Sequence, residues 1–121
     1  MINYESLIGN QGNIYPMAGW SIQPGRIVTG ATTLDTTYYR VEADTTAAPF
    51  IITLPLDPQP ALTYEIEDGA AAGSFGTNNL TIDGNGKSIN GAGTLVLNAN
   101  FASRFLRYNG TRWIVIAQGP V

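Results

Sequence analysis

The chain has 121 residues, a length that is enough for one ordinary domain and too short for two well-formed cores. Its net charge is −3. Charged residues make up 12% of it, about half the ~25% usual in soluble domains. Histidine and cysteine are absent, which excludes disulfides, zinc and iron–sulfur sites, thiol nucleophiles and every Ser-His-Asp arrangement. The acidic balance argues against binding to nucleic-acid phosphates, which needs clustered Lys and Arg. We therefore expect no enzyme activity, no cofactor and no bound metal.

The sequence shows no targeting or membrane signal. The N-terminus lacks the basic start and apolar run of a secretory signal, and the longest apolar run, residues 113–117, is far shorter than the roughly 20 residues of a membrane helix. These features predict a protein that is made in a cytoplasm and has no membrane partner.

Residues 1–30 form the first segment, in which isolated apolar and aromatic residues stand among turn-forming Gly, Asn and Pro. Neither a helical nor a strand period persists there. Packing on the chain's own domain, docking on a partner and disorder all remain open; we expect an extended N-terminal arm that anchors the chain to a partner. Its anchor residues would be Tyr4, Leu7, Ile8, Ile14, Tyr15, Met17, Trp20 and Ile22.

Residues 31–121 are predicted to form a β-domain. Strand signals lie at residues 33–43, 50–54, 62–67, 80–82 and 95–97, and Gly-Asn turns separate the later ones. Residues 62–67 alternate cleanly between apolar and polar side chains, as in a strand with one buried face. The spacing predicts an all-β domain of short antiparallel strands in a sandwich or barrel, and it also fits a β-helix-like stack.

A C-terminal hairpin is the strongest local prediction. Asn109 and Gly110 are typical of a two-residue type I′ turn, in which both central residues have positive φ. Such a turn would pair Leu106 with Trp113 and would place Arg107 opposite Arg112.

Several side chains could carry chemistry or contacts. Glu65 and Glu67 share one strand face, about 6.5–7 Å apart, which approaches the carboxyl separation of inverting glycosidases. We expect them instead to form a charge cluster with Arg107 and Arg112, of the same chain or of a neighbouring subunit, or around a ligand. The Asp-Gly-Asn-Gly run at residues 83–86 resembles part of a calcium loop but favours a tight turn.

A family resemblance rests on five segments in a fixed order. They are residues 51–55 (IITLP), 64–69 (YEIEDG), 76–82 (GTNNLTI), 86–91 (GKSING) and 106–115 (LRYNGTRWIV). Together they resemble a β-module of tailed-bacteriophage virion proteins, found in capsid decoration (cement) proteins, head fibres and tail fibres. The Gly-Ala-Ala-Ala-Gly run at 69–73 departs from the shorter, more polar turn of that module.

The resemblance implies a β-rich, homotrimeric component of a virion assembled in the host cytoplasm. With room for one module and no shaft, the chain favours a capsid decoration or head-fibre protein that binds the major capsid protein. The first alternative is a short tail-fibre or baseplate-associated protein that contacts tail proteins and recognises a host cell-surface glycan. The second alternative is a free carbohydrate-binding protein.

Overall fold

The computed structural model of the chain describes residues 25–119. These residues form strands that are joined by turns and loops. The strands are β2 (Arg26–Val28), β3 (Thr32–Thr33), β4 (Arg40–Ala43), β5 (Phe50–Thr53), β6 (Thr63–Asp68), β7 (Leu80–Asp83), β8 (Thr94–Leu97), β9 (Ser103–Tyr108) and β10 (Trp113–Gly119). The predicted all-β character is confirmed over this part of the chain.

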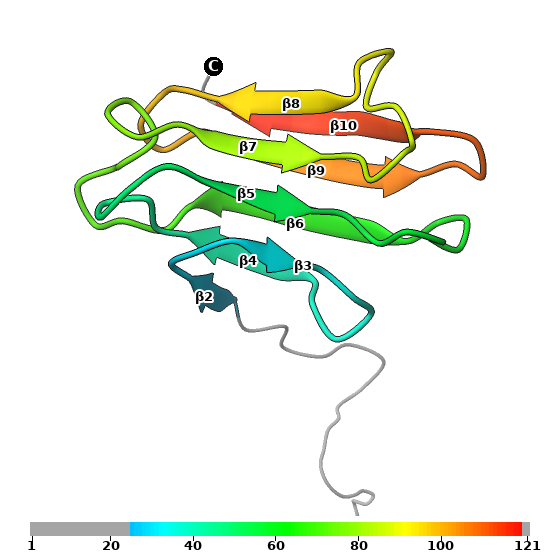
Figure 1. Cartoon of the computed structure of the whole chain (residues 1–121), viewed down its shortest axis with the longest axis horizontal. Helices are drawn as coiled ribbons and strands as arrows, with labels where there is room; N and C mark the ends of the chain where they lie inside the picture. Colours follow the sequence, from blue (N-terminus) through cyan, green and yellow to red (C-terminus); the bar gives the residue numbers. More distant parts are fainter. Residues whose placement is uncertain (1–24, 120–121) are drawn as a thin grey trace, which may run out of the picture.

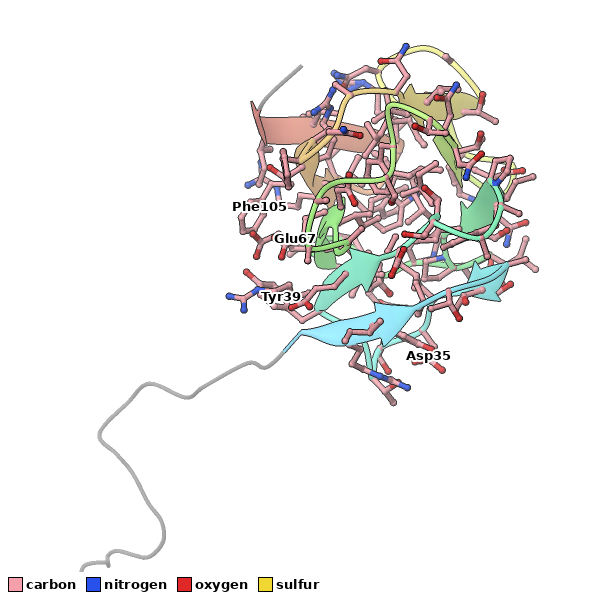
Figure 2. The ribbon with its side chains drawn as sticks, turned by 90° about the vertical axis from the view of Figure 1, so that its left-hand side faces the viewer. Asp35, Tyr39, Glu67 and Phe105 are labelled. Atoms are coloured by element: carbon pink, nitrogen blue, oxygen red, sulfur yellow. The ribbon has the colours of Figure 1, made fainter. Side chains whose placement is uncertain are left out.

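Two sheets face each other. The first has the strand order β10-β9-β6-β4-β2, and the second has the order β3-β5-β7-β8 (Figure 1). Figure 2 shows the same two layers from the side, with the side chains of their inner faces filling the space between them. The arrangement is compatible with the predicted sandwich.

The direction of the strands differs from the expected antiparallel pattern. Four of the seven strand pairings are parallel, namely β2 with β4, β4 with β6, β3 with β5, and β5 with β7. From β2 to β7 successive strands alternate between the sheets, so each strand meets its neighbour only after the chain has crossed over and returned. This part of the chain winds as a flattened coil, close to the β-helix-like stack, and the purely antiparallel prediction is wrong.

The core lies between the sheets. Strand alternation produces it: in β6, Tyr64 and Ile66 are fully buried while Glu65 and Glu67 on the other face are half-buried. Trp113 is fully buried, and its ring lies 5.8 Å from that of Tyr64. The other buried hydrophobic residues are Leu34, Val41, Ala43, Ile52, Leu54, Phe75, Leu80, Ile82, Ile89, Leu97, Ala102, Leu106 and Tyr108.

The C-terminal hairpin forms, but with a different register. Trp113 pairs with Tyr108 rather than with Leu106. The Asn109 side chain accepts the backbone N–H groups of residues 111 and 112, each at 2.9 Å, and so closes a four-residue loop instead of a two-residue turn. The slip of two residues keeps the side chains of residues 113–115 on their predicted faces, and a register shift follows between Val115 and Ala117. It also removes the predicted Arg107–Arg112 pair, because Arg107 lies opposite Ile114.

The two-residue turn signal holds elsewhere in the chain. Asn85 and Gly86 both have positive φ, and the Lys87 N–H donates to the Gly84 carbonyl at 3.1 Å. Residues 83–86 therefore form the tight turn that their sequence favours, with the Asp83 carboxylate accepting the Asn85 N–H at 2.8 Å.

The segment 1–30 is described only from Gly25 onward. Within it, β2 pairs with β4 at the edge of the five-stranded sheet. The expected arm anchors, from Tyr4 to Ile22, lie outside the described residues.

Candidate functional site: the outer faces of the two sheets

The two glutamates of the predicted charge cluster, Glu65 and Glu67, lie on the outer face of the five-stranded sheet. Arg40 is in register with Glu65 and Glu42 with Glu67, because β4 and β6 are parallel neighbours. The Arg40 Nε donates to Glu65 Oε1 at 3.3 Å, and the two side chains are 40% and 22% exposed. Arg40 is the partner that sequence reasoning missed, since a spacing of 25 residues leaves no local signal of the contact.

The electrostatics of this face centre on Glu67. Burial raises the pKa of Glu67 above its usual value, and repulsion from Glu65 and Glu42 adds to the effect. Arg40 opposes it, and a hydrogen bond with Glu65 raises the pKa further. Glu67 on this face therefore binds a proton more readily than an isolated glutamate does.

The two predicted arginines do not join this cluster through ion pairs. Arg107 lies on the same outer face, opposite Thr63, and is exposed. Arg112 lies in the exposed loop before β10. In residues 25–116, the one ion pair within 4.0 Å is that of Arg40 and Glu65, so the intrachain pairing of Arg107 and Arg112 with Glu65 or Glu67 does not form.

Two aromatic rings accompany the acidic residues. Tyr39 and Phe105 meet edge to face with ring centroids 6.4 Å apart, and Figure 2 shows both on the outer side of the sheet together with Glu67. Both rings are half-buried. By contrast, Tyr108 and Trp113 belong to the core, with centroids 5.3 Å apart, so they form no exposed platform.

A second polar centre, which sequence reasoning missed, lies at the end of β6. The Asp68 carboxylate accepts the backbone N–H groups of Ala70, Ser74, Phe75 and Phe101 and the Ser74 hydroxyl, at 2.7–3.2 Å. Burial works to raise the pKa of Asp68, but these bonds outweigh it and hold the pKa below its usual value. Asp68 thereby joins the loop after β6 to the turn after β8. This arrangement holds structure together and leaves the carboxylate no role as a free acid or base.

The Gly-Ala-Ala-Ala-Gly loop is explained by that centre. Gly73 has φ +82°, and a Cβ there would lie 2.6 Å from the Cβ of Asn100. The loop thus needs a glycine to pass close to the turn after β8. Ser74 links it further, because the Thr45 hydroxyl and backbone N–H both donate to Ser74 Oγ at 2.9 and 3.0 Å.

The outer face of the four-stranded sheet has a different chemistry. Ile51, Thr81 and Val96 lie in register across β5, β7 and β8. Ile51 is 47% exposed and Val96 is 46% exposed. The remaining outward residues are Thr33, Thr53, Asp83 and Thr94. We call these seven residues the threonine face; Asp83 is its one charged member, and its carboxylate already caps a turn.

Two features are absent from the described part of the chain. No group of three or more acidic residues there could hold a metal ion. Over the same residues, no helix is long and apolar enough to cross a membrane.

In comparisons with known proteins, no family model matches the chain, and a search of curated proteins finds no match to it.

Proposed function

We propose that the chain is a non-enzymatic structural protein of a tailed-bacteriophage virion, a capsid decoration or head-fibre protein that binds the assembled capsid. The observation that carries the proposal is the threonine face: a sheet surface of two large apolar side chains, four threonines and one aspartate whose carboxylate accepts a turn N–H. The resemblance of the sequence to the virion module supports it independently.

The threonine face suits contact with another protein. Burying an unpaired charge at an interface costs several kcal/mol, and this face carries almost none. Exposed β-branched side chains in register also offer a regular surface with little rotamer entropy to lose. Ile51 and Val96 supply the apolar centre that protein interfaces use, and the threonine hydroxyls can pair with polar groups at the rim.

The proposed mechanism is stabilisation by binding. A protein that binds only the assembled capsid, where capsomers meet, stabilises that state by mass action, by about 3 kcal/mol per site at a concentration of 100 Kd. A homotrimer would strengthen weak contacts with the major capsid protein, since linked contacts raise avidity by about 10²–10⁴. The chain would bind the capsid in the host cytoplasm, where the virion assembles, and would remain part of the virion.

The test uses purified chain and capsids that lack it. We expect the chain to co-sediment with the capsids and to raise their rupture temperature. Thr81→Lys places a charge at the centre of the threonine face on an outward position, and it should weaken capsid binding at least about tenfold without unfolding the domain. Thr63→Lys, on the outer face of the other sheet, is the matched control and should bind normally.

Two results would refute the proposal. One is wild-type chain that neither binds the capsids nor raises their rupture temperature. The other is equal binding by Thr81→Lys and Thr63→Lys, which would remove the threonine face from the argument.

A second candidate function is glycan recognition by a tail-fibre or baseplate-associated protein. The Tyr39–Phe105 ring pair favours it, since Glu65 lies opposite Phe105 and Glu67 lies on the same face, and sugars stack on aromatic rings and hydrogen-bond to carboxylates. Binding to host cells that is lost in Phe105→Ala would support this function, or that of a free carbohydrate-binding protein. Detection of the chain in purified virions distinguishes the two.

A further inference from the structure

The turn between β8 and β9 carries an aromatic residue in a conformation that disfavours it. The Ala102 N–H donates to the Ala99 carbonyl at 3.1 Å, which closes a turn with Phe101 at the third position. Phe101 has φ +66°, in the left-handed region. Turns with positive φ at this position favour Gly or Asn, because a Cβ crowds the backbone there.

The rest of the described chain follows that preference. Apart from Phe101, the described residues with positive φ are Gly or Asn, with Ala61 as the exception. A chain with 14 glycines has the residue that this turn favours in common use. Local backbone energy therefore does not account for Phe101.

Burial does not account for it either. The Phe101 side chain is 53% exposed, whereas Phe75, which lies in the loop on the other side of Asp68, is fully buried. A phenylalanine with a strained backbone and a solvent-exposed ring adds little to the stability of the isolated domain. Such strain persists at sites that act on something else.

The turn is held in place by its neighbours. The Phe101 N–H donates to Asp68 Oδ2 at 3.1 Å, and the Gly76 N–H donates to Asn100 Oδ1 at 2.8 Å. These bonds tie the turn to the loop after β6, so the backbone that carries the ring is fixed before any partner arrives. Pre-organised aromatic side chains are the usual anchors of protein interfaces.

The two loops around the Asp68 centre, one of which carries the ring, have no charged residue of their own. These loops are residues 69–76 and 98–102, and in the first of them Ala71 and Ala72 are exposed. A membrane surface would call for basic residues around an apolar anchor, and these loops have none. An apolar pocket with a neutral rim on a protein is the partner that fits.

We propose that Phe101 is a pre-formed anchor that inserts into an apolar pocket on the protein partner of this chain. Under the proposed function, on which this step rests, that partner is the capsid surface. The anchor follows directly after β8, which contributes Val96 to the threonine face, so the face and the anchor lie on neighbouring parts of the chain.

The experiment compares Phe101→Gly with Ala61→Gly. Both replace a residue at positive φ by glycine, and Ala61 lies in the exposed turn before β6. We expect each variant to unfold at a temperature about 2–5 °C above that of the wild type, because the strain is relieved. Binding to chain-free capsids should weaken about 10- to 30-fold for Phe101→Gly and should be unchanged for Ala61→Gly.

The possible results separate this inference from the proposed function. If the wild-type chain binds no capsid, the proposed function fails. Independently of capsid binding, a Phe101→Gly variant that unfolds at a lower temperature than the wild type would overturn the inference about Phe101. If the wild type binds and Phe101→Gly binds equally well, the anchor is wrong and the proposed function stands. Binding of the wild type to neutral or anionic lipid vesicles, lost in Phe101→Gly, would overturn the protein pocket in favour of a membrane.

Discussion

Removal of the Asp68 carboxylate is expected to cost this fold more than any single surface contact. Its five hydrogen bonds reach donors of Ala70, Ser74, Phe75 and Phe101. Ser74 is 5% exposed and Phe75 is fully buried, so in Asp68→Ala their two backbone N–H groups lose their acceptor in a place that water reaches poorly. A buried donor without a partner costs about 1–3 kcal/mol, which gives about 4 kcal/mol for the two.

The measurement is urea and thermal unfolding of Asp68→Ala against the wild type. For a domain of this size, about 4 kcal/mol corresponds to a fall of about 15–30 °C in Tm. Asp68→Asn keeps one acceptor oxygen but turns an amide donor toward the other N–H groups, so about half of the loss is expected. Asp44→Ala is the control, because the half-buried Asp44 accepts the backbone N–H of the nearby Thr46 and does not join two loops through its carboxylate.

The pH dependence gives a second check on the same residue. The pKa of Asp68 is lowered on folding, so its stabilisation is complete above the unfolded value of about 3.8 and is lost as the pH falls through the folded value. The stability gap between wild type and Asp68→Ala should therefore narrow in acid. An Asp68→Ala protein that unfolds no earlier at pH 7 than Asp44→Ala would refute the reasoning.

Two further changes test other parts of the fold. The pKa of Glu67 is raised on folding by burial and by repulsion from Glu65 and Glu42. The charged form of Glu67 therefore lowers the stability of the fold once the pH exceeds the unfolded pKa of 4.5. Glu67→Gln should raise the midpoint of urea unfolding slightly at pH 7 and leave it unchanged at pH 3.5. Burial raises the pKa of Tyr64 to about 12, which keeps its hydroxyl protonated and donating to the Asp35 carbonyl at 2.8 Å. Tyr64→Phe should cost about 1 kcal/mol in urea unfolding at every pH from 5 to 9, and a loss confined to one end of that range would contradict this account.

The sequence predicted the strands well where burial is on one face. The alternation of residues 62–67 matches β6, and residues 50–54 and 80–82 match β5 and β7 to within one residue. Residues 33–43 were predicted as one strand signal, but the structure divides them into the end of β3, a turn and β4. Thr, Tyr and Val favour strands without marking where a turn interrupts them.

The direction of the strands was not predictable from the same signals. A strand with one buried face alternates in the same way in a parallel and in an antiparallel pair, so β4 and β6 carry no mark of their shared direction. The hairpin register failed for a similar reason. Asn109 offers its side chain as well as its backbone, and the side-chain bonds to residues 111 and 112 selected a longer loop.

In the candidate site, too, contacts within one strand could be predicted from the sequence and contacts between strands could not. Glu65 and Glu67 could be placed together because they stand two residues apart on one strand, but Arg40 and the ring pair of Tyr39 and Phe105 could not. Those partners reach the site from other strands. The Asp68 centre was also hidden, because its donors come from two loops, and the donor Phe101 lies 33 residues after Asp68 in the sequence.

The sequence by itself determined the class of the fold, the face of each strand and the absence of thiol and imidazole chemistry, because these follow from residue type and from a period of two residues. The tertiary structure decided the coiled path of β2 to β7, the partner of each charged side chain and the exposure of Phe101. Those features depend on which strands bury their inner faces against one another. The pairing of the strands is set by the free energy of the whole core, which no short segment of the sequence determines.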